Sequence, residues 1–133
     1  MAGLLGDFRA AVATVLQAKL PTPTALWDVV PDDVAELPCV VLTRPGAAPT
    51  SAAVVYDLAL DLYVLGRRQQ AGGSEDELVS LADDVWTVLG GTRGVAQDDY
   101  HISAERIDPR ITTVAGLEIP SYVITVVSSA ATC

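Results

Sequence analysis

The stretch that decides the fold is residues 53–65, which read Ala-Val-Val-Tyr-Asp-Leu-Ala-Leu-Asp-Leu-Tyr-Val-Leu. From Val54 to Val64 every second residue is apolar or aromatic, whereas the alternate positions include Asp57 and Asp61. A period of two with one wholly apolar face predicts a strand that lies with that face on a core. Most strands run to about five or six residues, so this strand is long and we expect the sheet to be built around it.

Apolar residues recur at helical spacing in two segments, one before and one after this strand. Residues 4–20 are expected to form the first helix, which ends before Pro21. Residues 74–89 are expected to form the second, because Ser74 and Glu77 make a capping box and Gly90 and Gly91 suit a helix end. The predicted core faces are Leu5, Phe8, Val12, Val15 and Leu16 in the first helix, and Leu78, Leu81, Ala82, Val85, Val88 and Leu89 in the second.

Shorter strand patterns complete the expected fold. Residues 25–30, 37–43, 98–107 and 121–128 read as strands, residues 109–120 as a turn or hairpin tip around Gly116, and residues 129–133 as a loose tail. The sequence therefore predicts an α+β fold, with a mainly antiparallel sheet of about four to five strands packed against two helices. At 133 residues the chain is expected to be a single domain, residues 1–133.

The composition excludes several classes of function. The net charge is -9, and the single lysine and seven arginines form no cluster, which argues against tight binding to nucleic-acid phosphates. No stretch approaches the roughly 18 apolar residues of a membrane span, and the N-terminus lacks the pattern of a secretory signal. Cys39 and Cys133 make no disulfide framework, so we expect a reducing compartment. The low share of charged residues, 19%, suggests a surface partly covered by other subunits.

A search for catalytic or metal-binding residues gives none that we assign. Asp57 and Asp61 share a strand face but lie about 13 Å apart, too far for a pair of glycosidase carboxylates. His101 is the only histidine and has no ligands at zinc spacing. The glycine-rich residues 90–94 follow a helix, whereas a phosphate loop precedes one. We therefore expect no enzyme activity and no cofactor.

Three local patterns, together with the order of the elements, carry a resemblance to a known family. They are Leu-Pro-Cys-Val-Val-Leu at 37–42, Leu-Ala-Leu-Asp-Leu-Tyr-Val at 58–64, and Gly-Leu-Glu-Ile-Pro-Ser-Tyr-Val-Ile-Thr-Val at 116–126. With the order helix, strand, strand, long strand, helix, strand, strand, the chain resembles the tail terminator, or tail completion, proteins of long-tailed bacteriophages. The resemblance covers nearly the whole chain and contains no sharp motif.

The resemblance implies a small α+β subunit that forms a hexameric ring. In that family the ring caps the tail tube, ends its polymerisation and presents a surface to the head connector. The implied partners are further copies of the chain, the major tail tube protein and a head–tail connector or stopper protein, without a membrane. The implied location is the tail or neck of the virion, assembled in the bacterial cytoplasm. Six copies of a chain with charge -9 would let DNA pass through the ring without specific binding.

Two groups of residues are candidate interfaces on this interpretation. Residues 44–52 have no apolar period and are expected to form a projecting loop that docks on the tube or the next subunit. Its candidate contact residues are Arg44, Pro45, Gly46, Pro49 and Thr50. Arg67 and Arg68 are expected to pair with Asp83 or Asp84 of a neighbouring subunit. The alternatives are a plain surface loop and solvated basic residues on a turn.

Two other functions stay open from the sequence. One is a head-side stopper or adaptor of the phage neck, which shares the partners but does not contact the tube. The other is a small ligand-binding accessory domain of a bacterial enzyme, which predicts a pocket with converging polar groups.

Overall fold

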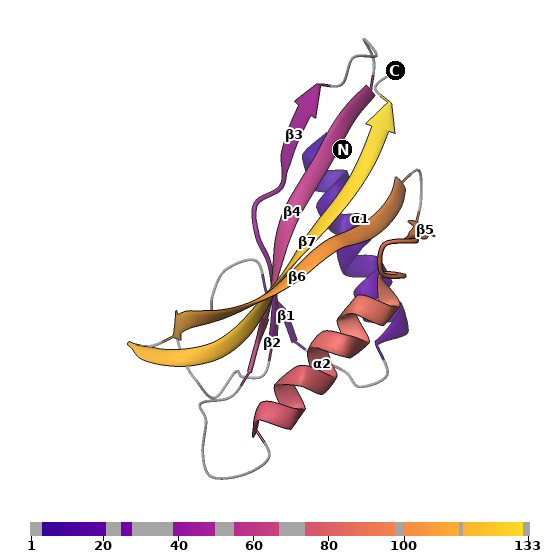
Figure 1. The fold of residues 1–133 in the computed structure, drawn as a ribbon. Helices are drawn as coiled ribbons and strands as arrows, with labels where there is room; N and C mark the ends of the chain where they lie inside the picture. The colour runs from indigo at the N-terminus through magenta and orange to yellow at the C-terminus, as the bar shows by residue number, and fades with distance from the viewer. Residues whose placement is uncertain are drawn as a thin grey trace.

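The computed structural model describes residues 4–20, 25–27, 39–49, 55–66, 74–97, 100–114 and 116–131. Within them, two helices and a mostly antiparallel, curled sheet form an α+β fold, which confirms the predicted class (Figure 1). The elements in chain order are α1 (Leu4–Lys19), β1 (Ala25–Trp27), β2 (Cys39–Leu42), β3 (Gly46–Pro49), β4 (Val55–Leu65), α2 (Ser74–Val88), β5 (Val95–Gln97), β6 (Tyr100–Val114) and β7 (Leu117–Ala131). The sheet of seven strands is larger than expected, because the sequence patterns did not predict β3 and β5.

The long strand predicted from residues 53–65 is β4, and it lies in the middle of the sheet. The strand order is β1-β2-β4-β7-β6-β5, and β3 pairs with β4 beyond the end of β2. All pairs are antiparallel except that of β1 with β2. Leu62 of β4 lies opposite Leu42 on one side and Ile124 on the other. The central position predicted for this strand is therefore confirmed.

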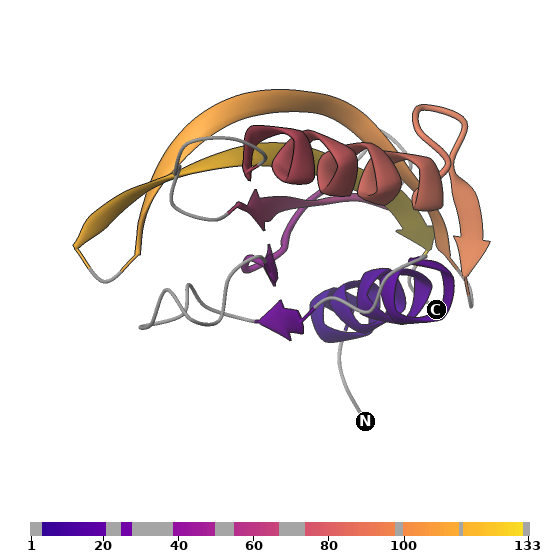
Figure 2. The ribbon, with the colours of Figure 1, turned by 90° about the horizontal axis from the view of Figure 1, so that it is seen from below.

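One face of β4 forms the core with the two helices. Leu58, Leu60, Leu62 and Val64 are at most 3% exposed, as the alternation predicts. The helices contribute the buried residues Phe8, Ala11, Val12, Val15 and Leu16 from α1, and Leu78, Leu81, Ala82, Val85 and Leu89 from α2. Figure 2 shows the sheet curling around α1. The prediction for Leu5 is wrong: it is 39% exposed, and Ala11 faces the core instead.

The glycine-rich residues 90–94 end helix α2, as predicted. Gly90 and Gly91 have φ values of 75° and 55°, a region that L-residues with a side chain rarely adopt. The amide of Gly91 donates to the Trp86 carbonyl at 3.0 Å. A side chain at Gly90 would place its Cβ 2.5 Å from the carbonyl oxygen of Gly94. Gly90 and Gly91 therefore adopt the left-handed conformation that commonly ends a helix.

Strands β6 and β7 form a hairpin much longer than the sequence predicts. Gly116 lies in its turn with φ of 77°, at the predicted place, but residues 109–114 and 117–120 are strand and not turn. Residues 129–131, expected as a loose tail, continue β7. The two prolines of the hairpin are tolerated for different reasons. Pro109 lies on the outer strand β6. Pro120 lies beyond the last residue of β4, and its carbonyl accepts a hydrogen bond from the Gly66 amide at 3.0 Å.

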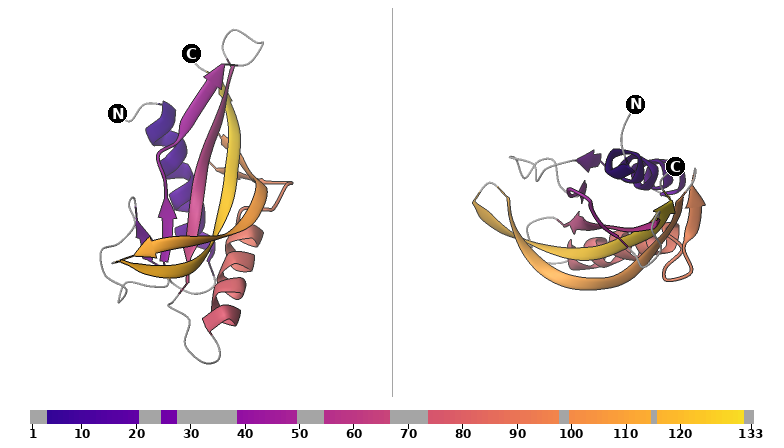
Figure 3. Two further views of the ribbon diagram at one scale, coloured as in Figure 1. Left: turned by 60° about the vertical axis from the view of Figure 1, so that its left-hand side comes forward. Right: turned by 90° about the horizontal axis from the view of Figure 1, so that it is seen from above.

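A second, smaller core lies on the face of the sheet away from the helices. It consists of Cys39, Val41, Leu65, Val114 and Ile119. The end of the β6–β7 hairpin curves across this face (Figure 3), which brings Val114 and Ile119 to β2 and β4. Thr112 and Ser121 join the two hairpin strands through a hydroxyl–hydroxyl hydrogen bond of 2.8 Å. Cys39 in this core is fully buried, at 0% exposure.

Candidate interaction surfaces

The segment expected as a docking loop contains an edge strand. Gly46 to Pro49 form β3 and pair with β4, with Gly46 opposite Ala59 and Pro49 opposite Tyr56. The predicted loop is therefore wrong at these positions. The sequence Gly-Ala-Ala-Pro shows no alternation, so its pairing follows from the length of β4, which extends beyond the end of β2.

Side-chain and backbone contacts fix where this edge strand begins. The Thr43 hydroxyl donates to the Asp61 carbonyl at 2.7 Å and accepts from the Asp61 amide at 3.2 Å. Arg44, next in the chain, is exposed, and Pro45 is half-buried. On its side away from β4, β3 has no partner strand among the described residues. Main-chain groups at such an edge can pair with another chain. Thr50, the last candidate of this group, lies outside the described residues.

The structure describes only one side of the predicted pairing of Arg67 and Arg68 with Asp83 or Asp84. Arg67 and Arg68 lie outside the described residues. Asp83 is exposed and Asp84 half-buried, both on α2. Figure 1 shows α2 and β3 far apart on the molecule, so the acidic candidates on α2 do not lie beside the candidate interface residues of β3. A contact between α2 and the edge at β3 needs two copies of the chain.

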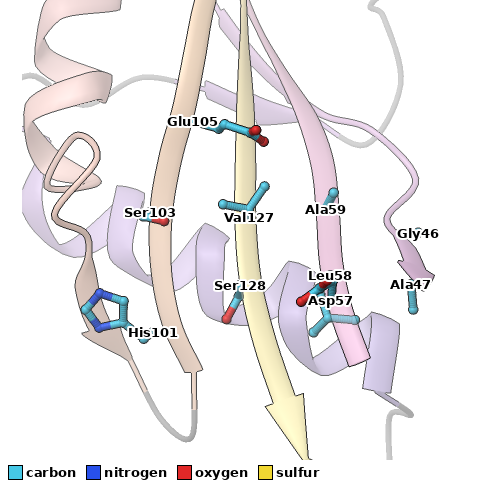
Figure 4. A pocket seen from close by; sticks show the side chains of 10 residues that line it. All are labelled: Gly46, Ala47, Asp57, Leu58, Ala59, His101, Ser103, Glu105, Val127 and Ser128. Carbon is cyan, nitrogen blue, oxygen red and sulfur yellow. The ribbon is translucent and has the colours of Figure 1, made fainter. Parts of the chain in front are cut away.

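An open groove lies on the sheet face opposite α1, across β3, β4, β7 and β6 (Figure 4). Its volume is about 790 Å³, and it is hollow because small residues such as Gly46, Ala47, Ala59 and Ser103 line it. Figure 4 shows Glu105 extending from β6 across β7, and Asp57 on β4. The groove therefore combines an apolar floor with two carboxylates.

The polar groups of the groove do not converge on one point. Figure 4 shows His101 and Asp57 on opposite sides of it. The His101 Nε2 lies 2.8 Å from the Arg93 carbonyl oxygen, which can only accept, so this nitrogen carries a proton. No group of three or more His, Cys, Asp or Glu residues able to hold a metal occurs in the described part of the chain. A ligand in the groove would therefore meet its polar groups at separate points.

The far end of the β6–β7 hairpin is a surface that the sequence patterns missed. We call residues 109–114 and 116–122 the distal hairpin. It carries Ile111, which is 70% exposed, whereas Val114 in the same strand is 1% exposed. The alternation of the apolar residues Ile107, Pro109 and Ile111 indicates a strand here, but Pro109 and Pro120 favoured the prediction of a turn. From Glu105 onward, β6 has no partner strand on its outer side among the described residues.

Helix α2 presents an acidic outer surface. Its sequence contains Glu75, Asp76, Glu77, Asp83 and Asp84 and no basic residue. Asp76, Glu77 and Asp83 are exposed, and Val79 between them is 38% exposed. An exposed aliphatic residue beside acids is a feature of a surface that can receive a partner.

Comparisons with known proteins give no family assignment. No helix in the described residues is long and apolar enough to span a membrane. No protein-family model matches the chain, and no curated protein matches it.

Proposed function

We propose that this chain is a structural subunit of a bacteriophage tail that assembles into a ring, caps the tail tube and ends its polymerisation. One observation carries the proposal beyond the resemblance itself. The three sequence patterns at 37–42, 58–64 and 116–126 contribute to β2, β4 and β7, three neighbouring strands in the middle of one sheet. The patterns therefore belong to a single structural unit and are not scattered similarities.

The form of the sheet supports a role in assembly. A ring needs two different surfaces on each subunit, which meet head to tail and close by rotation. The sheet has different edges, with β1 and β3 at one side and β6 with β5 at the other. Edge strands with unpaired main-chain groups are suited to contacts between subunits.

The proposed partners follow from this role. They are further copies of the chain, in a hexamer, together with the major tail tube protein and the head–tail connector or stopper protein. The complex would belong to the tail or neck of a virion that assembles in the bacterial cytoplasm. With a net charge of -9 per subunit, the ring would repel DNA that passes through it, so no specific nucleic-acid contact is proposed.

A tube-elongation assay tests the proposal. Purified tail tube protein from the same genome is allowed to polymerise with and without this chain, and tube lengths are measured by electron microscopy. We expect added protein to stop growth, so that tubes become shorter as its concentration rises. Equal length distributions with and without the protein would overturn the proposal. Binding to the connector without an effect on tubes would favour the stopper or adaptor of the phage neck.

The groove is the observation that favours a second candidate function, a ligand-binding accessory domain of a bacterial enzyme. It carries Asp57 and Glu105 beside an apolar floor, which suits a small cation with an apolar part. A thermal-shift screen with diamines and polyamines tests this candidate. A shift that Asp57→Ala removes would favour it, whereas no shift in any of these compounds would count against it.

A further inference from the structure

The distal hairpin carries apolar side chains that the fold itself does not cover. On β6 and β7 the cross-strand pairs continue from the core outward as Ile107 with Ile124, Pro109 with Tyr122, and Ile111 with Pro120. Ile124 is fully buried, whereas Ile111 is 70% exposed. The face of the sheet that meets the helices in the core is therefore still apolar where no helix covers it. Exposed apolar side chains grouped in this way mark contact surfaces.

The distal hairpin also carries a positive charge, Arg110, that has no ion-pair partner in the described part of the chain. Arg106 and Asp108 form an ion pair of 2.8 Å, so these two charges compensate each other. Arg110 is exposed and forms no ion pair among the described residues. Arg110 and Ile111 point to opposite faces of β6 and flank its unpaired edge, so a surface that approaches this edge meets both. Glu118 lies on β7, one strand further from the edge.

A surface with the complementary properties lies on α2. Val79 is 38% exposed, which makes it one of three exposed large hydrophobic residues in the described chain, together with Leu5 and Ile111. Asp76 and Asp83 lie three residues before and four residues after Val79, so all three share one face of the helix. Neither aspartate forms an ion pair among the described residues, and α2 contains no basic residue.

These two surfaces cannot meet within one chain. Figure 1 shows the distal hairpin at the left of the molecule and α2 at its lower right. We propose that the distal hairpin of one copy docks on α2 of the next, with Ile111 against Val79 and Arg110 beside Asp76 and Asp83. Because the two surfaces differ, the contact is head to tail and can close into a ring. This inference rests on the proposed ring and names the contact that builds it.

The open groove is the competing receptor for the hairpin, and the exposure of the apolar side chains favours α2. In the groove Val127 is half-buried and Ala47 and Ala59 are small, whereas Val79 of α2 is 38% exposed.

Charge reversal in the full-length chain tests the contact. Arg110→Glu, Ile111→Glu and Asp83→Arg are each expected to weaken self-association by about tenfold or more, measured by sedimentation velocity over a range of concentrations. Arg110→Glu combined with Asp83→Arg in one chain is expected to restore association to within about threefold of the unchanged protein. Arg93→Glu is the matched control, because it reverses another exposed arginine and should leave association unchanged.

Mixing two defective variants tests the head-to-tail arrangement. A variant with Arg110→Glu and Ile111→Glu keeps an intact α2, and a variant with Val79→Glu and Asp83→Arg keeps an intact hairpin. Each alone is expected to be monomeric. The mixture is expected to give dimers that do not grow, since each pair contains one intact contact. All the changed residues are exposed, so the circular dichroism spectra of the variants should match that of the unchanged protein.

The outcomes separate this inference from the proposed function. A ring that forms normally with Arg110→Glu and Ile111→Glu would overturn the inferred contact and leave the ring intact. Association broken by Asp57→Arg but not by Asp83→Arg would place the hairpin in the groove and also overturn it. An unchanged protein that remains monomeric at all concentrations and does not affect tubes would refute the proposed function itself.

Discussion

Truncation of Leu62 to alanine tests whether the two faces of β4 have the different roles assigned to them. Leu62 is fully buried, faces the helices, and lies between Leu42 of β2 and Ile124 of β7. Removing three carbons at such a site costs transfer free energy and leaves a cavity, together about 3 to 4 kcal/mol. With a urea m-value of about 1.5 kcal/mol/M, the midpoint of unfolding should fall by roughly 2 M.

Asp61→Ala is the matched control on the next residue. The Asp61 side chain is exposed on the opposite face of β4, and truncation keeps the main-chain groups that bond to Thr43. We expect a change within about 0.5 kcal/mol. Urea unfolding followed by circular dichroism at one fixed protein concentration measures both variants, because self-association makes apparent stability depend on concentration. A loss below about 1 kcal/mol for Leu62→Ala, or similar losses for both variants, would refute the assignment of the two faces.

Three further predictions concern single positions. Gly90→Ala should cost more than about 1 kcal/mol in thermal or urea unfolding, because φ is 75° and the new Cβ would lie 2.5 Å from a carbonyl oxygen. Gly46→Ala has open space and should change stability by less than about 0.5 kcal/mol; equal effects of the two glycine variants would contradict the geometry. Thr43→Val should cost about 1 kcal/mol through the hydroxyl that bonds to the Asp61 main chain, and Thr43→Ser should recover most of it. Cys39→Ser should destabilise by about 1 to 3 kcal/mol and more than Cys39→Ala, since Cys39 is fully buried; the reverse order would argue against an apolar environment.

The sequence predicts the centre of this fold because there one periodic pattern and one buried face coincide. Alternation in β4 and helical spacing in α1 and α2 each follow from contact with the same core, so local pattern and tertiary burial agree. The helix end at Gly90 was predictable because a left-handed residue there favours glycine. Leu5 fits the helical spacing but lies at the N-terminal end of α1, where the core no longer covers it.

The missed elements depend on neighbours that are distant in sequence. Strand β3 has no apolar alternation and forms because β4 extends past the end of β2. The distal hairpin contains two prolines that usually end strands, and both lie where the sheet does not require their missing amide. Consequently residues 46–49 were assigned to the candidate interface loop at 44–52, and the exposed Ile111 was not identified. Whether residues 44–52 contact a partner stays a prediction.

The most direct test of the proposed function is electron microscopy of the purified protein, alone and mixed with tail tubes. We expect rings of six copies in the protein alone, and one ring at the end of each tube after mixing. Monomers in the first sample together with bare tube ends in the second would contradict it.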